Sequence, residues 1–390
     1  QLIKNGAVVD ADINGMSSSK LSGALPAISG ASLTNLPTPI GKTRNLIING
    51  AMQVAQRGTS FTASSSYPVD RFRIDDGGHE ELSTKEQAAV TSGGAYDAGF
   101  RKCIKITNGN QTGGAGSSDY NQIMTRIEAK DIANSGWNYK SSSSFITLSF
   151  WVKSSVAQVF SGSLRTADGT LYSYKFDTPS LSADTWTKVT KTIPGNSNLT
   201  FDDDANLGMQ LFIFPFIGTG YTGDGSATET WVTAGSNYAN NMTSTWWTTN
   251  DATFELTGVQ LEVGSVATDF EHLFFSQDLK LCERYFEVIS QGDAYIAIAM
   301  CYSSSTATGV VQCRTTKRAT PTIYQTSGSS YYRFYRNAGS QDISSFTGLA
   351  GAHVNGGAFY SSGSLSHTAG HAGGFHGVNA NSLVALQSEL

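Results

Sequence analysis

Strict alternation of apolar and polar side chains is the feature that most restricts the fold of this chain. In residues 145–153, FITLSFWVK, apolar side chains occupy every second position. These positions are Ile146, Leu148, Phe150 and Val152. A period of two is typical of a β-strand with one face against a core, so we expect Thr147 and Ser149 to face outward.

Two further stretches predict long strands. Residues 207–216, LGMQLFIFPF, are apolar enough to lie between two layers, and we expect Pro215 to end that strand. In residues 254–263, FELTGVQLEV, the apolar positions change phase after Gly258. An extra residue in one strand produces such a change, so the sequence predicts a β-bulge at Gly258.

The composition also favours strands over helices. Charged residues make up 15% of the chain, whereas about 25% is usual, and 41 Gly, 20 Phe and 16 Tyr suit short strands and tight turns. We therefore expect a mainly β protein. The net charge of −5 includes no basic block, so the sequence does not predict binding to nucleic acid.

The character of the sequence changes along the chain. Residues 1–43 contain two Leu-Pro pairs, which are incompatible with a regular helix, and Leu and Ile side chains without local partners. We expect an extended trimeric stalk there, with a disordered linker as the alternative. Residues 44–275 begin with the tight-turn pair Asn49-Gly50 and predict a β domain. A Ser N-cap candidate and helical spacing over 276–289 predict a connector helix, which we place at 276–290.

Residues 291–390 predict a β-rich tip domain. Short strand candidates occur in AYIAIAMCY, TGVVQCR, PTIYQ and YYRFYR. The last 45 residues are rich in Gly, Ser and His, and we expect loops with little core there. The chain begins with Gln1 rather than Met, so we also expect a segment before it.

Catalytic and metal-binding motifs are incomplete in this sequence. Residues 41–43, GKT, resemble the end of a phosphate-binding loop, but Leu36 stands where its first Gly belongs. Residues 79–81, HEE, begin like a zinc-protease motif, but Ser83 replaces the second His. Residues 202–204, DDD, begin like a calcium loop whose later ligands are absent, so we expect a solvated turn. We predict no enzymatic activity, no metal site and no cofactor.

The cysteine spacing and the hydropathy pattern indicate whether the chain forms disulfides and whether it enters a membrane. Four cysteines lie at long, unequal spacings, which favours reduced thiols over a disulfide framework. The sequence has no signal peptide and no apolar run of about 18 residues, so we expect no insertion into a membrane.

Aromatic residues in polar surroundings are the candidates for ligand binding. A flat ring can stack on the C–H face of a sugar while neighbouring polar groups bind its hydroxyls. In the central domain the candidates are Trp231, Tyr238, Trp246 and Trp247. In the tip domain they are Tyr360, His367, His371, Phe375 and His376. The alternatives are that the central rings cap a core and that the histidines serve as hydrogen-bonding groups. Histidines gathered on a three-fold axis to bind a divalent metal are a further hypothesis.

Several segments resemble the jelly-roll domain of bacteriophage and prophage tail-fibre proteins in their order and spacing. They are NLIINGAMQVAQRGTSF from residue 45, VDRFRI, SFWVKSS, and TGVQLEVGSVATDFEH followed by LKLCERYFEV. The resemblance covers about residues 44–289, and LSGALPAISG resembles the stalk repeats of such proteins. Their jelly roll is similar to carbohydrate-binding modules that hold calcium. Gln53 and Thr257-Gly258 stand where two calcium ligands belong, so we expect no calcium.

The resemblance implies a non-enzymatic virion tail-fibre subunit, made in the host cytoplasm, that attaches to the host bacterial surface. The expected partners are host polysaccharide or lipopolysaccharide, two further copies in a homotrimer, and other virion tail proteins. The predicted fold has an extended stalk, a central jelly-roll β-sandwich, a short connector helix and a β-rich tip. The alternatives are a polysaccharide depolymerase tailspike and a purely structural fibre or collar protein.

Overall fold

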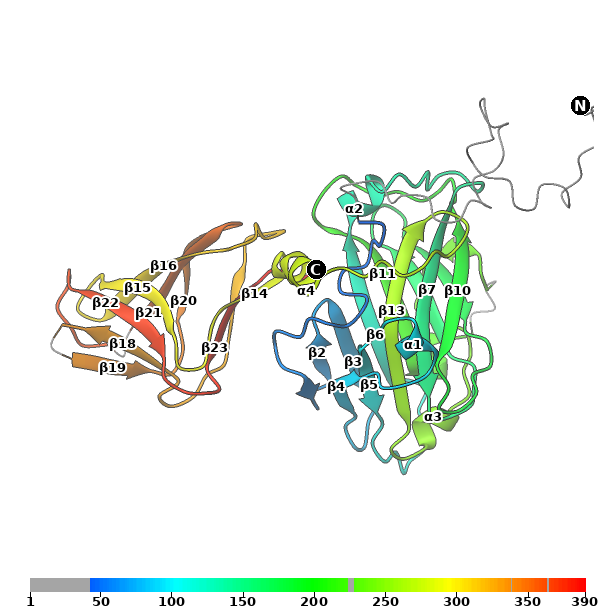
Figure 1. The fold of residues 1–390 in the computed structure, drawn as a ribbon, viewed down its shortest axis with the longest axis horizontal. Coiled ribbons are helices and arrows are strands. Elements are labelled where there is room, and N and C mark those ends of the chain that lie inside the picture. The colour runs from blue at the N-terminus through cyan, green and yellow to red at the C-terminus, as the bar shows by residue number, and fades with distance from the viewer. Residues whose placement is uncertain (1–42, 224–227, 338, 363–364) are drawn as a thin grey trace, which may run out of the picture. The chain divides into compact units, whose positions relative to one another are not determined.

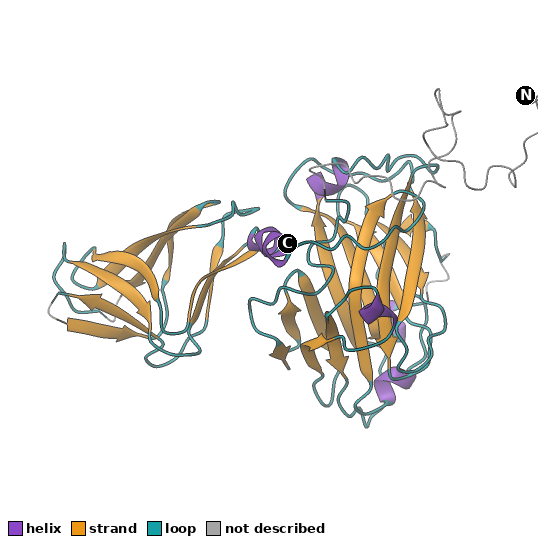
Figure 2. Cartoon of the chain, viewed as in Figure 1, coloured by secondary structure: helices purple, strands orange, loops and turns teal. Residues whose placement is uncertain are grey.

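The structure, a computed structural model, describes residues 43–223, 228–337, 339–362 and 365–390. The chain divides into two units, residues 1–40 and residues 41–390. The predicted stalk at 1–43 lies outside the described residues, except for Thr43. The described residues of the second unit are mainly β, as predicted from the alternation and the low charge (Figure 2).

The central domain is a sandwich of two antiparallel sheets (Figure 1). Among the described residues, the first sheet, called the β7 sheet, has six strands in the order β1 (Ser60–Phe61), β4 (Thr84–Ala89), β5 (Lys102–Thr107), β13 (Thr253–Val263), β7 (Phe145–Ser154) and β10 (Thr187–Pro194). The second, called the β6 sheet, has in the same part of the chain seven strands in the order β12 (Trp231–Thr233), β9 (Tyr172–Asp177), β8 (Ser161–Thr166), β11 (Leu207–Ile217), β6 (Tyr120–Glu128), β3 (Phe72–Gly77) and β2 (Ser65–Val69). This pair of sheets forms the predicted jelly roll.

The main hydrophobic core lies between the two sheets. The four alternating apolar residues of β7 are fully buried in it, as the sequence predicts. Thr147 and Ser149 alternate with these core residues, as expected, but they are also buried, which the pattern of the strand did not predict. A smaller core that includes Ala51, Val90 and Phe100 covers the opposite face of the β7 sheet. The loops that cover this face are distant from β7 in sequence, so the alternation of apolar residues within β7 does not predict them.

The two predicted strand irregularities have different outcomes. The register of β13 against β7 shifts between Thr257 and Gln260, which confirms the predicted bulge at Gly258. Strand β11 is buried as expected, but it continues through Pro215 to Ile217. Its register shifts between Ile213 and Phe216. A bulge therefore accommodates Pro215, and the prediction that this residue ends the strand is wrong.

Short helices connect or flank the strands. In the described residues they are α1 (Gly94–Asp97), α2 (Ala129–Ala133), the 3₁₀ helix η4 (Thr219–Tyr221), α3 (Thr245–Thr248) and α4 (Phe275–Glu283). Helix α4 is shorter than the predicted connector, because the chain becomes strand β14 at Phe286. Tyr285 and Phe286 are buried and leave the helical path. No helix of the described residues is long and apolar enough to span a membrane.

Two more antiparallel sheets form from residue 286 onward. Among the described residues, one contains β14 (Phe286–Gln291), β23 (Leu383–Gln387) and β17 (Thr322–Gln325). The other contains β19 (Gly339–Ile343), β18 (Tyr332–Arg336), β22 (Ala372–Gly377), β15 (Tyr295–Cys301), β16 (Thr306–Gln312), β21 (Gly356–Ser362) and β20 (Gly348–His353). The four strand candidates in the sequence correspond to β15, β16, β17 and β18.

The last 45 residues form strands rather than the predicted loops. Phe359, Val384 and Leu386 are fully buried in a core of this region. The glycines there allow close packing: a Cβ atom at Gly373 would lie 2.5 Å from the ring of Phe334. A segment can thus be rich in glycine and still contribute to a core when a neighbouring strand supplies the side chains.

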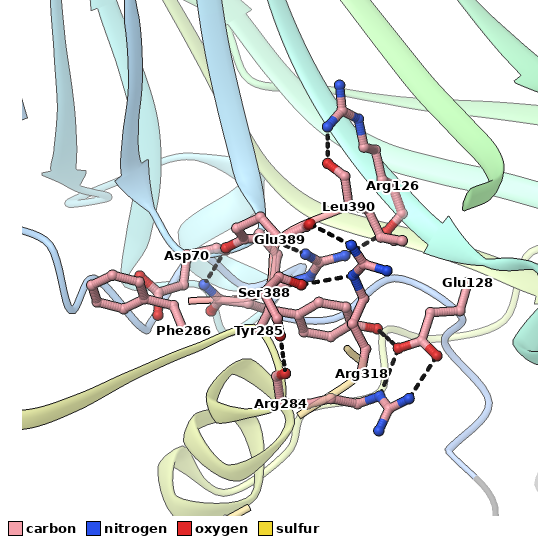
Figure 3. A network of polar contacts seen from close by, with 12 residues as sticks. Asp70, Arg126, Glu128, Arg284, Tyr285, Phe286, Arg318, Ser388, Glu389 and Leu390 are labelled. Carbon is pink, nitrogen blue, oxygen red and sulfur yellow. Dashed lines mark hydrogen bonds and ion pairs between the residues drawn. The ribbon is translucent and has the colours of Figure 1, made fainter. Parts of the chain in front are cut away.

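A buried polar network connects the last residues of the chain to the sandwich (Figure 3). Arg318 donates hydrogen bonds to the main-chain oxygens of Ser388 and Glu389, both at 2.7 Å. Arg284 donates two hydrogen bonds, at 2.6 and 2.8 Å, to the carboxylate of Glu128 at the end of β6. Arg126 of β6 donates to the main-chain oxygen of Leu390, so the end of the chain lies next to β6, which also carries the candidate site.

Candidate functional site: a pocket on the outer face of the β6 sheet

The face of the β6 sheet that points away from the sandwich core carries a pocket of about 360 Å³. Strand β6 provides its floor because side chains alternate along a strand. Asn121, Ile123, Thr125 and Ile127 are buried on the core side. The residues that line the pocket, here called the β6-face pocket, are Arg73, Asp75, Tyr120, Gln122, Met124, Arg126, Gln210, Phe212, Ile217, Tyr221 and Tyr238.

Aromatic rings form one continuous part of this lining. The ring centres of Tyr120 and Tyr221 are 6.0 Å apart, and those of Tyr221 and Tyr238 are 6.5 Å apart, both in edge-to-face geometry. Tyr238 also contacts Phe212 edge to face, at 5.6 Å. A small second core that includes Phe212, Phe214 and Ile217 supports these rings from below. The three tyrosine side chains are half-buried, so part of each ring is open to a ligand.

Polar groups lie beside the rings. Arg73 donates from Nε to Asp75 at 2.8 Å, and Gln122 donates to the same carboxylate at 3.4 Å. Arg126 donates from Nη1 to the main-chain oxygen of Leu390. Gln210 approaches the sulfur of Met124 at 3.6 Å. The pocket therefore combines guanidinium, amide and carboxylate groups with flat apolar rings.

Burial changes the ionisation of two lining residues. Burial lowers the pKa of Arg126, and the nearby positive charges of Arg73 and Arg71 lower it further. Burial also raises the pKa of Tyr120, and the negative charge of Asp75 acts in the same direction. Tyr120 and Arg126 are half-buried, so the lining is partly shielded from water, and charge-assisted hydrogen bonds are stronger there than at an open surface.

The predicted aromatic residues of the central domain lie in different places. Tyr238 lines the β6-face pocket. Trp246 and Trp247 belong to α3 and are fully buried, with Nε1 donating to the main-chain oxygens of Thr253 and Gly114, both at 3.0 Å. Trp231 is also buried, and its Nε1 donates to Pro194 at 2.7 Å. These three tryptophans are core residues with no open ring face, which corrects the expectation that they stack on a ligand.

The predicted residues of the tip domain are not gathered either. Phe375 is fully buried in the core and is not available to a ligand, which corrects its assignment. His367 packs against Phe334 at 5.7 Å, whereas His371 is exposed. His376 contacts the rings of Tyr295 and Tyr335, at 4.4 and 5.6 Å. Tyr360 is half-buried beside Gly348 on β20.

A second, more open pocket lies at this part of the tip domain. It has a volume of about 540 Å³, and Tyr295, Ile298, Tyr335 and Arg336 are among its lining residues. Ile298 is 89% exposed and Tyr295 is 72% exposed. Its charged and amide side chains are Arg336 and Asn337, so it offers fewer groups that would orient a polar ligand than the β6-face pocket does.

Sequence reasoning missed most of the β6-face pocket. A usable signal is present in residues 120–128, YNQIMTRIE, where Tyr, Gln, Met and Arg alternate with core residues. A strand whose outer positions carry an aromatic residue, an amide and a guanidinium is suited to recognition. Tyr221, whose ring contacts that of Tyr120, is about a hundred residues away in η4, and no local pattern relates these two tyrosines.

A metal site is the remaining kind of functional site to consider. Among the described residues, no group of three or more His, Cys, Asp or Glu side chains is arranged to hold a metal ion. Asp204 instead accepts hydrogen bonds from Asn206, and Asp202 and Asp203 are exposed. The four cysteines are free thiols.

No protein-family model matches this chain, and no curated protein matches it. Solved structures with some likeness include tailspike protein 4 of bacteriophage CBA120, as its enzymatically active domain. It is 11% identical with a TM-score of 0.31, and the match covers 57% of this chain but only 22% of that chain. A putative sugar-binding protein from Bacteroides thetaiotaomicron is 13% identical with a TM-score of 0.33, covering 56% of this chain and all of that one.

A family 11 carbohydrate-binding module of a cellulosomal cellulase from Clostridium thermocellum is 12% identical with a TM-score of 0.25. That match covers 55% of this chain and 98% of the module.

Proposed function

We propose that this protein binds carbohydrate in the β6-face pocket and attaches a virion to the host bacterial surface as a tail-fibre subunit. The observation that carries the proposal is the side-by-side placement of Tyr120, Tyr221 and Tyr238 with Arg73, Asp75 and Gln122 in one recess. Aromatic faces suit the C–H surfaces of sugar rings, and the polar groups suit their hydroxyls.

The same recess supports binding rather than cleavage. Glycoside hydrolysis normally uses two carboxyl groups on either side of the bond that is broken. Asp75 is the carboxylate among the described lining residues, and it is already held by Arg73 and Gln122. We therefore propose a non-catalytic attachment protein that acts as a homotrimer in the virion, with host polysaccharide or lipopolysaccharide and other tail proteins as partners. Three sites on one fibre would allow weak single contacts to act together.

The test uses purified bacterial surface polysaccharides immobilised on beads. Retention of the full chain is compared with retention of the variants Tyr221→Ala and Tyr302→Ala. Tyr302 is a matched control because it is a 71% exposed tyrosine on the tip domain, outside the pocket. Removing a central aromatic contact costs about 1–2 kcal/mol, so Tyr221→Ala should weaken binding by about fivefold to thirtyfold while Tyr302→Ala binds normally.

Reducing ends in the supernatant are measured in the same experiment. Retention without new reducing ends supports the proposal. Release of reducing ends by the full chain would favour the depolymerase alternative, and no retention on any host polysaccharide would favour a purely structural role. Equal loss of binding in both variants would contradict the location of the site.

A further inference from the structure

Positive charge is concentrated on the outer face of the β6 sheet, although the chain as a whole is acidic at −5. Arg73 pairs with Met124 on β6, and Arg126 lies two residues further along the same face. Such diagonal neighbours in an antiparallel sheet lie about 7–8 Å apart. Arg126 in turn pairs with Gln210, and Gln210 pairs with Arg165 on β8. Three arginines thus occupy adjoining positions on one sheet face.

The single described carboxylate of the pocket does not balance these charges. Asp75 accepts from Nε of Arg73, so the described lining holds one carboxylate beside two arginines, Arg73 and Arg126. The guanidinium of Arg165 stacks on Tyr238, 3.9 Å from the ring centre, and donates to the main-chain oxygen of Gly235 at 2.9 Å. It adds positive charge directly behind one of the pocket's aromatic rings.

Arg126 also has unused hydrogen-bonding capacity. Its Nη1 donates to Leu390, but its Nε is buried and has no hydrogen-bond partner among the described residues. A buried donor without a partner costs free energy, so a turn of the Arg126 guanidinium toward a ligand oxygen in the pocket is favourable. Guanidinium groups bind carboxylate and phosphate oxygens in a planar, charge-assisted geometry, which a sugar hydroxyl does not match.

We propose that the β6-face pocket selects acidic glycans, in which Arg126 and Arg73 bind a carboxylate or phosphate oxyanion while the adjoining sugar ring packs on Tyr120 and Tyr221. This inference rests on the proposed carbohydrate binding and adds the class of glycan. The oxyanion occupies the partly shielded floor, where it balances the excess positive charge. The neutral part of the sugar lies on the aromatic rings.

The test measures the affinity of the full chain for matched glycan pairs by titration calorimetry. One pair is oligogalacturonate and a galacto-oligosaccharide of equal length, and the other is phosphorylated mannan and unmodified mannan. We expect the acidic member of at least one pair to bind about tenfold more tightly. Preference within the first pair identifies a carboxylate and preference within the second a phosphate. The advantage should decrease as salt is raised, because screening weakens charge pairs.

The variants Arg126→Gln and Arg73→Gln should each remove most of the acidic preference, measured as the ratio of the affinity for the acidic glycan to that for its neutral partner. Arg101→Gln is the control, since Arg101 is an exposed arginine that also stacks on a tyrosine, Tyr96, but lies outside the pocket. Thermal melts establish that each variant is folded, and two separate arginines keep the test valid if one variant is unstable. Equal affinity for acidic and neutral glycans, or a preference unchanged in both variants, overturns the inference but leaves carbohydrate binding intact. If neither acidic glycan binds, the inference is overturned, and retention on host polysaccharide decides the proposed function separately.

Discussion

Glu389 forms an ion pair with the buried guanidinium of Arg71, 318 positions away in sequence, and that guanidinium lies 3.4 Å from the ring centre of Tyr285. Glu389 also pairs with Arg57, at 2.9 Å. One carboxylate near the end of the chain thus joins two arginines of the sandwich domain. The pair matters for the candidate site because Arg126, which lines the pocket, binds the next residue, Leu390.

The substitution Glu389→Gln tests this connection. Removing one partner of a buried ion pair costs about 3 kcal/mol or more, because the other charge stays buried without compensation. All six tryptophans lie between residues 137 and 247, so their fluorescence reports unfolding of the sandwich. We expect the fluorescence transition to move to lower denaturant. Glu229→Gln is the control: Glu229 pairs with Lys191 at the surface, and we expect a loss below about 1 kcal/mol. Equal effects of the two substitutions would contradict the buried role of Glu389.

The acid stability of the sandwich should depend on Glu128. Burial raises the pKa of this carboxyl, but hydrogen bonds from Arg284 and Tyr285 and nearby positive charges outweigh burial, so its pKa lies below the ordinary 4.5. A lowered pKa stabilises the folded state above pH 4.5, and this contribution is lost as pH falls through the folded-state value. Thermal melts of the native chain and Glu128→Gln should therefore differ by a constant amount above about pH 5.5. Below the ordinary pKa the difference should shrink, whereas a difference that is independent of pH would show that the charge of Glu128 is unimportant.

Trp247 tests whether the tryptophans of α3 are core residues. Its ring is fully buried and lies 5.0 Å from that of Phe216. We expect Trp247→Ala to cost about 3–5 kcal/mol in unfolding free energy, since it leaves a large cavity. Tyr238→Ala, on the pocket surface, should cost about 1 kcal/mol and mainly weaken glycan binding. A Trp247→Ala protein that keeps its melting transition but loses binding would restore the surface role that we rejected.

Gly258 tests the bulge in β13. Its φ is +63°, and a Cβ atom there would lie 2.5 Å from the ring of Phe100. We expect Gly258→Ala to destabilise the sandwich by about 2 kcal/mol, because both the backbone conformation and the contact are unfavourable for alanine. Gly235→Ala is the control, since a Cβ atom there has nothing within 4 Å. A neutral Gly258→Ala variant would mean that the bulge tolerates a side chain.

Local pattern was sufficient for the features that depend on one or two strands. The alternation in β7 and the phase change at Gly258 are properties of consecutive residues, and both predict the structure correctly. The errors concern contacts between distant segments. Thr147 appeared exposed in its strand but is covered by other loops, and helix α4 ends early because Tyr285 packs against Arg71.

The residues of the candidate site were also hard to predict, because they come from segments that are distant in sequence. Trp246 and Trp247 lie in polar sequence, yet their rings are buried under the ends of the sandwich strands, where Asn108 binds their main-chain oxygens. The pocket combines residues of β3, β6 and β11 with Tyr221 and Tyr238 from the segment after β11. Tyr238 was predicted because its neighbours are polar. The others were missed because the strands that carry them are recognised by their core-facing residues, and no local pattern shows which outer side chains meet in space.

The most direct test of the account is hydrogen–deuterium exchange of the full chain with and without a saturating glycan that it retains. The segment after β11 supplies Tyr221 and Tyr238 to the pocket, and its main chain includes exposed positions such as Gly220 and Ser236. We predict that the glycan slows exchange in residues 218–223 and 235–241 and leaves residues 353–376 of the tip domain unchanged. Slower exchange confined to residues 353–376 would contradict the account and place the binding site on the tip domain.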